Sequence, residues 1–404
     1  MSKASLCRGL LAFALLLGGG TTQAEVTLGA LFPLSGPLAV LGQESFRGVE
    51  LAAEARNAQG GINGEPIELI MGDAVDNNQA VGEARRLISV AGVEAILGTY
   101  SSSRSFAASQ AAELSGVPYF ELGAISDPIT ERGFQYLFRL NPTAQDFAET
   151  IVDAVPDALA PALGLDPETL KVAIIHEDSL YGQTVAGFQK ERAAERGLNV
   201  VEVLPYSAKA VDLSSVILRL KGAEVDAVLQ TSYQNDTVLF LQQSQDFDFS
   251  PAMVIGTGGG YSLKDSYEAV GATGMEGKFN VDFPQYRLNP EATPGIDDFI
   301  QRYQDKYGHF PRSGHSLANF FGANAVFDIL AAAESLEADA VRAAAMAMDQ
   351  PINQSVTGWG VKFDEKGQNQ RGRAYMMQWQ DGELVTVHPP EVAVAEILPD
   401  GRHR

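Results

Sequence analysis

The chain has 404 residues, of which 45% are hydrophobic, 29 are basic and 51 are acidic, giving a formal net charge of −22. This length predicts two domains or two large lobes, and the composition argues against intrinsic disorder. The negative charge disfavours binding to nucleic acid or to anionic membranes, so neither is expected as a partner.

The first 24 residues have the features of a secretory signal. Lys3 and Arg8 precede an apolar run, Leu10 to Leu17, that is too short to span a bilayer. The small residues that follow predict cleavage after Ala24. The mature chain would then lack the single cysteine, Cys7, and would carry 27 basic and 51 acidic residues, a net charge of −24. We therefore expect an exported protein without disulfides.

Short β-like runs alternate with helical runs along the mature chain. In the first group, strands are predicted at Val26–Phe32, Pro66–Gly72, Glu94–Gly98 and Val117–Leu122, and helices at Gly42–Gln59, Asn77–Ala91 and Ser105–Ser115. In the second group, strands are predicted at Lys171–His176, Val200–Tyr206, Ala227–Gln230 and Ala252–Gly256, and helices at about Gln183–Arg196, Ser214–Lys221 and Thr237–Gln245. This alternation indicates βαβ units and predicts two parallel sheets, one in each lobe.

The segments outside these two groups give weaker signals. Three prolines mark the stretch 146–168 as the approach to the second lobe. After Phe283 helices are predicted at Gly295–Tyr307, Ser316–Glu334 and Asp339–Met348, followed by strands near Gly360–Phe363 and Ala374–Trp379. The remaining tail begins with a proline-rich stretch and is expected to be mobile.

A series of short motifs runs in order through nearly the whole mature chain. They are Phe32-Pro33-Leu34-Ser35-Gly36-Pro37, Gly42, Gly60-Gly61-Ile62-Asn63-Gly64, Gly98-Thr99-Tyr100-Ser101-Ser102-Ser103, Gly116-Val117-Pro118, Thr130-Glu131-Arg132-Gly133, Tyr181-Gly182 and Phe363-Asp364-Glu365-Lys366-Gly367. Together they resemble the leucine/isoleucine/valine-binding protein family, which are type I periplasmic binding proteins of ABC importers.

The resemblance implies an α/β fold of two Rossmann-like lobes, with parallel sheets, joined by three hinge strands. By motif order, lobe 1 would comprise residues 25–143 and 284–355, lobe 2 residues 144–283 and 356–387, and the tail residues 388–404. It also implies a monomer in the periplasm that encloses a small-molecule ligand by hinge closure and delivers it to the membrane permease subunits of an ABC transporter. Neither a cofactor nor an enzymatic activity is expected.

In the family, a serine matching Ser102 binds the carboxylate of the ligand. Ser102 follows a predicted strand at the start of a helix, where free N–H groups suit an anion. Ser101 and Ser103 flank it, and all three could also act as simple helix caps. Gly123 matches a residue that offers its backbone to the ligand, although a plain turn glycine would look the same.

Tyr181 and Tyr233 match aromatic residues that the family places on the second lobe. Each follows a strand-like run, and tyrosine combines apolar area with a hydroxyl group, which suits a lid over a small molecule. Both could instead be ordinary core or surface tyrosines. His315 precedes a predicted helix, where it would either line the cleft or only begin the helix.

The sequence departs from the family where an α-ammonium group would bind. The family threonine is replaced by Ile125, the family glutamate falls at Gly258, and the aromatic residue of the first loop is Leu41. Hydrogen bonds to charged groups contribute roughly 1.5–3 kcal/mol each, so losing two acceptors predicts an affinity for leucine lower by about 100-fold or more. These three replacements would leave a roomier, more apolar pocket.

These replacements favour a small organic acid, aromatic or aliphatic, or a neutral polar compound without an α-ammonium. Glu121, Asp178 or Ser126 could supply the missing acceptor, so a branched-chain or other hydrophobic amino acid remains an alternative ligand. A sensor that reports its ligand to a signalling partner is the other alternative. The five histidines show no metal-binding spacing, and no GxSxG elbow or P-loop occurs. The glycine run 256–261 lies too late in the chain for a dinucleotide loop.

Overall fold

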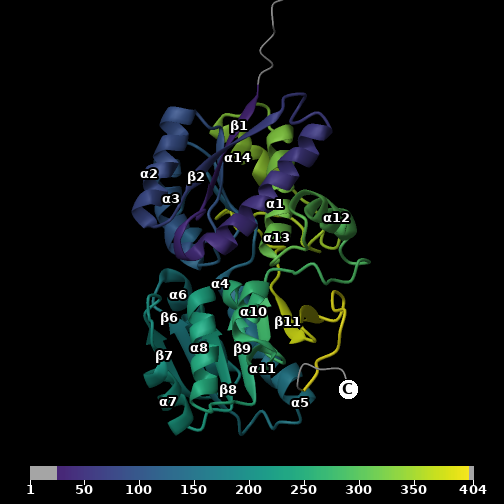
Figure 1. The fold of residues 1–404 in the computed structure, drawn as a ribbon. Coiled ribbons are helices and arrows are strands. Elements are labelled where there is room, and N and C mark those ends of the chain that lie inside the picture. The colour runs from purple at the N-terminus through teal and green to yellow at the C-terminus, as the bar shows by residue number, and fades with distance from the viewer. Residues whose placement is uncertain (1–24, 400–404) are drawn as a thin grey trace, which may run out of the picture.

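The computed structural model describes residues 25–399, so the predicted signal segment lies outside the described residues. Two α/β lobes lie end to end, with helices packed around a sheet in each (Figure 1). Within residues 25–399 no helix combines the length and the apolar character needed to cross a membrane. The two-lobe α/β arrangement is the one that the sequence pattern predicts.

The first lobe contains a five-stranded sheet in the order β2-β1-β3-β4-β5, and every strand pair in it is parallel. The strands are β1 (Val26–Phe32), β2 (Ile67–Asp73), β3 (Ala95–Gly98), β4 (Tyr119–Glu121) and β5 (Leu137–Arg139). The helices from this part of the chain are α1 (Ala39–Ala58), α2 (Asn77–Arg86) and α3 (Ser102–Leu114). Strand β1 is almost fully buried, as expected for a central strand covered on both faces.

The second lobe contains a seven-stranded sheet in the order β12-β11-β10-β9-β8-β6-β7. Its strands are β6 (Lys171–Glu177), β7 (Asn199–Tyr206), β8 (Ala227–Thr231), β9 (Met253–Thr257), β10 (Phe279–Asp282), β11 (Tyr375–Gln380) and β12 (Glu383–His388). Its helices are α4 (Ala144–Ala154), α5 (Ala160–Ala162), α6 (Leu180–Glu195), α7 (Ser214–Gly222), α8 (Gln234–Asp246), α9 (Gly259–Ser262), α10 (Lys264–Val270) and α11 (Ala272–Met275).

The expectation of a purely parallel second sheet is wrong at one edge. Strand β11 pairs antiparallel with β10 and with β12. Only Asp381 and Gly382 connect β11 to β12, and both have positive φ, at 49° and 81°. A two-residue connection of this kind forms a tight hairpin turn, and strands joined so closely can only be antiparallel.

After β10 the chain returns to the first lobe and adds three helices to it (Figure 1). These are α12 (Ile296–Tyr307), α13 (His315–Ala332) and α14 (Ala338–Ala347). Helix α13 packs against α1 at Gly48, where even a Cβ atom would overlap the carbonyl oxygen of Ser316. The close approach buries α13 almost completely and fixes the position of its first residue, His315.

Several elements differ from the prediction. Helix α4 occupies the first part of the stretch 146–168, in which prolines were expected to mark the approach to the second lobe. The helix can form there because the prolines of this stretch all come after Ala154 and because Thr143 caps the start of the helix. Strands β5 and β10 were not predicted, since runs of three and four residues are too short to show a period. The predicted strand at Gly360–Phe363 is wrong: this segment makes isolated bridges only.

The tail was expected to be mobile, but its described part packs on the second lobe. Val392 is only 1% exposed. The side-chain amides of Gln378 and Gln380 on β11 donate to the carbonyl oxygens of Leu398 (2.6 Å) and Glu396 (2.7 Å). Strand β12, which ends where the tail begins, was not predicted, and the backbone N–H of Val394 in the tail donates to the carbonyl oxygen of Thr386 on this strand.

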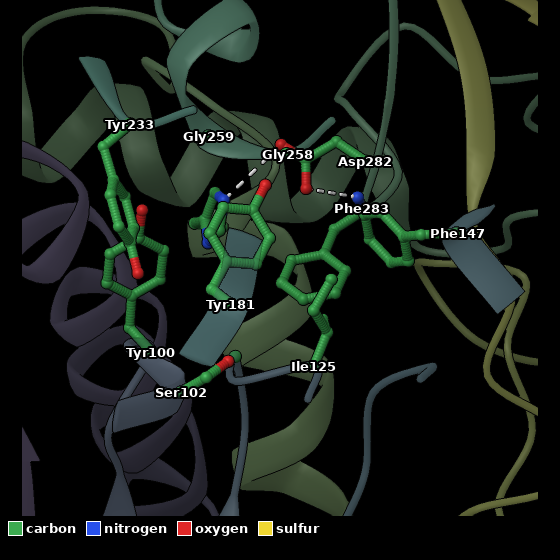
Figure 2. Close-up of a pocket in the computed structure, with 12 residues that line it drawn as sticks. Tyr100, Ser102, Ile125, Phe147, Tyr181, Tyr233, Gly258, Gly259, Asp282 and Phe283 are labelled. Atoms are coloured by element: carbon green, nitrogen blue, oxygen red, sulfur yellow. Dashed lines mark hydrogen bonds and ion pairs between the residues drawn. The ribbon is translucent and has the colours of Figure 1, made fainter. Parts of the chain in front are cut away.

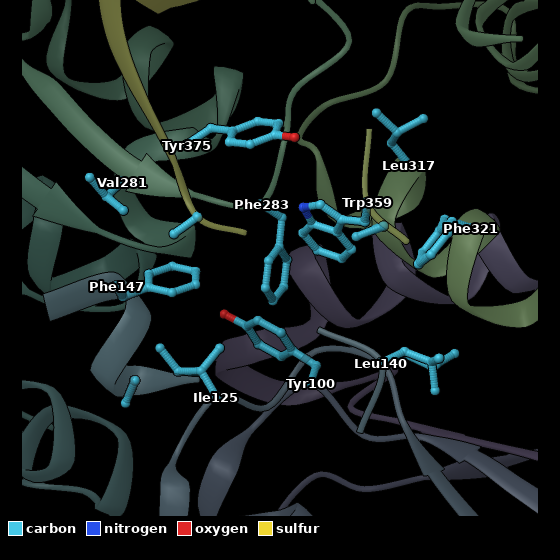
Figure 3. Close-up of a cluster of buried hydrophobic side chains, with 14 of the residues drawn as sticks. Tyr100, Ile125, Leu140, Phe147, Val281, Phe283, Leu317, Phe321, Trp359 and Tyr375 are labelled. Carbon is cyan, nitrogen blue, oxygen red and sulfur yellow. The ribbon is translucent and has the colours of Figure 1, made fainter. Parts of the chain in front are cut away.

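An aromatic cluster fills the junction of the two lobes (Figure 3). Phe283 follows β10 directly, and its ring lies 5.7 Å from those of both Phe147 and Trp359. Trp359 in turn contacts Phe321 of α13, at 5.8 Å. These contacts hold the end of β10 in a fixed position beside the first lobe.

Candidate ligand-binding site

A cavity lies between the two lobes. Both lobes and the junction between them contribute its twelve lining residues (Figure 2). They are Tyr100, Ser102, Gly123, Ile125 and His315 from the first lobe, and Phe147, Tyr181, Tyr233, Gly258, Gly259, Asp282 and Phe283 from the second lobe and the junction. A molecule held here would be enclosed on both sides.

The cavity lies at the carboxyl ends of the strands, the usual binding edge of open α/β sheets. Tyr100 follows β3, Gly123 follows β4 and Gly258 follows β9, while Asp282 is the last residue of β10. Strands β9 and β10 are parallel neighbours, with Thr257 opposite Val281. Asp282 therefore emerges beside Gly258, the position where the family glutamate was expected.

Ser102 begins helix α3 and is buried against the cavity. Its hydroxyl oxygen accepts a hydrogen bond from the backbone N–H of Ser126, at 3.3 Å. The preceding residue, Ser101, makes no side-chain cap to the helix. The first N–H groups of a helix have no partner within it, so the start of α3 offers donors suited to an anion. Ser101 and Ser103 do not line this cavity but an outer groove beside Arg104.

Three tyrosines form the aromatic wall of the cavity. The ring of Tyr233 lies 6.2 Å from that of Tyr100 on the opposite lobe and 5.2 Å from that of Tyr181. The hydroxyl of Tyr181 donates to the carbonyl oxygen of Thr257. Burial raises the pKa of all three hydroxyls, so they stay protonated at neutral pH. Tyr100 was present in the sequence motif that contains Ser102, but it was not predicted to line the site.

Asp282 and His315 form a buried acidic and basic pair in the cavity. Asp282 is 1% exposed, and one of its oxygens accepts from the backbone N–H of Phe283 at 2.7 Å. Its other oxygen lies 3.5 Å from Nε2 of His315, which is too long for a good hydrogen bond. Within residues 25–399 that oxygen and both ring nitrogens of His315 have no hydrogen-bond partner. Sequence reasoning missed Asp282 because it ends an unpredicted four-residue strand.

Glu121, considered from the sequence as an acceptor for a ligand, is already fully used. It is 0% exposed and its carboxylate binds the two loops that carry Tyr100 and Gly123. The donors are the backbone N–H groups of Thr99 (2.8 Å), Tyr100 (3.3 Å), Gly123 (2.8 Å) and Ala124 (2.6 Å) and the hydroxyl of Ser105. Burial raises the pKa of Glu121, and these hydrogen bonds oppose the increase. Its role is to position the site.

The other two acceptors considered from the sequence also point elsewhere. Asp178 is exposed and accepts from the backbone N–H of Ala208, at 3.0 Å. The hydroxyl of Ser126 donates across the lobe interface to the carbonyl oxygen of Leu180, at 3.2 Å. Neither residue lines the cavity. Ser126 nonetheless contributes indirectly, because its N–H binds Ser102.

Gly258 has a backbone conformation that excludes a side chain. Its φ is 68°, and a Cβ atom there would lie 2.6 Å from the hydroxyl oxygen of Tyr181. Both the positive φ and the close approach require glycine. The position therefore cannot hold an acidic side chain while Tyr181 keeps its bond to Thr257.

Two α/β lobes that meet around an enclosed cavity, each supplying strand-end residues to it, define a two-lobe ligand-binding protein. A family model described as periplasmic binding protein matches residues 25–383. The chain belongs to this family, among the Leu/Ile/Val-binding proteins. It is 52% identical over 374 residues to Leu/Ile/Val-binding protein homolog 8 of Brucella abortus, covering 93% of each chain. It is 50% identical over 384 residues to homolog 7 of Brucella suis, covering 95% of this chain and 96% of that protein.

Solved structures share the fold at lower sequence identity. LivJ of Streptococcus pneumoniae, solved in complex with isoleucine, has a TM-score of 0.77 at 22% identity, covering 92% of this chain and 99% of that one. A solute-binding protein of R. palustris, solved in complex with 4-hydroxybenzoate, has a TM-score of 0.77 at 19% identity, covering 94% of this chain and 98% of that one. These similarities support the type I periplasmic binding protein fold.

Proposed function

We propose that this protein is the periplasmic substrate-binding component of an ABC importer, exported with removal of residues 1–24. It captures a small ligand between its lobes, has no enzymatic role and hands the ligand to membrane permease subunits. The observation that carries the proposal is the enclosed cavity with residues from both lobes. The family membership supports the same conclusion.

We propose further that the ligand is a small carboxylate with an apolar body. Ser102 and the start of α3 suit the carboxylate, and the surrounding rings and Ile125 suit an aromatic or aliphatic body. Of the structural neighbours, the R. palustris protein was solved with an aromatic acid, 4-hydroxybenzoate. Mass spectrometry of small molecules released from the denatured protein would identify the natural ligand, and a ligand without a carboxylate would contradict this proposal.

A hydrophobic amino acid is the second candidate, and Asp282 is the observation that favours it. This buried carboxylate supplies an acidic acceptor that the sequence pattern did not identify. The S. pneumoniae neighbour was solved with isoleucine. Titration with L-leucine separates the candidates: binding at micromolar concentration or tighter would favour the amino acid and exclude the carboxylate without an α-ammonium.

Ser102→Ala is expected to weaken ligand binding by about tenfold or more without unfolding the protein. The variant removes a buried hydroxyl at the expected carboxylate position, and hydrogen bonds to charged groups contribute about 1.5–3 kcal/mol. Isothermal titration with the natural ligand measures the change. Ser115→Ala, at the exposed far end of the same helix, is the matched control and should bind normally. Equal affinities for the two variants would show that Ser102 does not contact the ligand.

A further inference from the structure

We infer that Asp282 and His315 form a second polar end of the cavity, opposite Ser102, and that they select ligands with a hydrogen-bond donor at the end remote from the carboxylate. This inference rests on the proposed function, since it assigns a ligand class to the same cavity. The ligand would carry a carboxylate, a flat or apolar middle and a hydroxyl or ammonium group at the far end.

The first argument is the incomplete hydrogen bonding of the pair. Asp282 and His315 are 1% and 2% exposed, so water does not reach them freely. Buried polar atoms in folded proteins nearly always have partners, yet one oxygen of Asp282 and both nitrogens of His315 have none within residues 25–399. All three atoms belong to side chains that line the cavity. A donor on an enclosed ligand would complete the hydrogen bonds of Asp282.

The second argument is the charge of the cavity wall. None of its twelve lining residues is lysine or arginine, and Asp282 is the only carboxylate among them. The neighbouring hydroxyls of Tyr100 and Tyr181 remain protonated, because burial raises the pKa of each and the charge of Asp282 adds to the increase. This end of the cavity therefore favours O–H or N–H donors and disfavours a second carboxylate.

The third argument is the separation of the two polar ends. Figure 2 shows Ser102 at one side of the cavity and Asp282 at the other, with the ring of Tyr181 between them. The side chain of Phe283 also faces this middle region, and its ring lies 5.0 Å from that of His315. An α-amino acid carries its ammonium next to its carboxylate. A ligand with the donor at the opposite end matches this arrangement better.

Four commercial acids test the inference on the wild-type protein without any substitution. Benzoate has no donor, 2-hydroxybenzoate has one beside the carboxylate, and 4-hydroxybenzoate and 4-(aminomethyl)benzoate have one at the far end. Isothermal titration of the purified mature protein should give affinities for the last two that exceed that for benzoate by about tenfold or more. The affinity for 2-hydroxybenzoate should not exceed that for benzoate. The two far-end donors distinguish a hydroxyl ligand from an ammonium ligand.

Asp282→Asn then tests the residue. The substitution keeps the size of the side chain but removes its charge and one acceptor oxygen, so the preference for far-end donors should disappear. In Asp282→Asn the affinities for 4-hydroxybenzoate, 4-(aminomethyl)benzoate and benzoate should agree to within about threefold, whereas Asp178→Asn, the matched control at an exposed position, should keep the wild-type preference. Circular dichroism and the thermal midpoint establish whether the variant is folded. If it does not fold, the titration of the wild-type protein with the four acids decides the inference.

The outcomes separate this inference from the proposed function. Equal binding of benzoate and the two far-end donors would overturn the inference and leave the binding-protein assignment intact. A preference for 2-hydroxybenzoate would overturn the placement of the donor opposite the carboxylate. Binding of none of the four acids would count against both the inference and the proposed carboxylate ligand.

Discussion

Gly259→Leu is expected to weaken ligand binding by about 100-fold or more while the thermal midpoint changes little. Gly259 begins α9 on the second lobe and faces the first lobe. A Cβ atom there would overlap Cδ1 of Leu41 and lie 2.9 Å from the hydroxyl oxygen of Tyr100. The clash is between the lobes and not within either core, so we expect it to be relieved by opening the cleft. If only the closed form binds the ligand, the observed affinity falls in proportion to the fraction of molecules that are closed.

The effect of this substitution can be checked by titration and by small-angle scattering. Gly187→Leu is the control, because Gly187 lies on the exposed face of α6 with nothing within 4 Å of its Cβ position. Adding Leu41→Ala to the Gly259→Leu variant should restore part of the affinity by making room on the opposite lobe. Wild-type affinity in the single variant would show that the arrangement of lobes described here is not the binding-competent one.

Glu121→Gln is expected to lower the free energy of unfolding by about 3 kcal/mol or more. All five groups around the Glu121 carboxylate are donors, so an amide there would replace one acceptor oxygen with an NH₂ group that faces other N–H groups. Each hydrogen bond to a charged group contributes about 1.5–3 kcal/mol, and a buried donor left without a partner adds a further cost. Urea denaturation at neutral pH measures the loss.

Ligand binding should weaken in the same variant, because Glu121 holds the loops of Tyr100 and Gly123 together. Glu168→Gln, at an exposed position, should change the unfolding free energy by less than about 0.5 kcal/mol. Glu177 offers a comparison in the second lobe: it accepts from the N–H and hydroxyl of Ser179 and from the N–H of Gly182, each at 2.7 Å. Because fewer donors surround Glu177, Glu177→Gln should lower the free energy of unfolding by less than Glu121→Gln does. Wild-type stability of Glu121→Gln would refute the positioning role.

Much of the fold follows from local patterns in the sequence. The strands β1, β6 and β8 were predicted to within a residue or two, because each is a continuous apolar run between turn or helix signals. The missed strands β5 and β10 are short, and they exist only because neighbouring strands supply their hydrogen bonds. The antiparallel edge at β11 depends on the two-residue turn at Asp381 and Gly382. This turn can be recognised as a hairpin only when the strands on both sides of it are known, and β12 was not predicted.

The candidate site divides in the same way. Ser102, Gly123, Tyr181, Tyr233 and Gly258 were singled out from the sequence, and all five line the cavity, although their contact with a ligand stays a prediction. These residues follow strands or lie at the starts of helices. In a parallel sheet the carboxyl ends of the strands lie at the same edge, so the order of predicted strands and helices is enough to bring these residues together. The ligand class inferred from the loss of ammonium acceptors also stays a prediction.

The sequence by itself determined the two-lobe architecture, the family and the strand-end residues around the cleft, because these depend on periodicity and motif order. Only the tertiary structure decided which charged groups are available. It placed Asp282 beside His315 in the cavity and surrounded Glu121 with donors from two loops and a helix. The physical reason is that a carboxylate becomes a binding group or a structural one according to the partners it meets on burial, and those partners come from segments far apart in the chain.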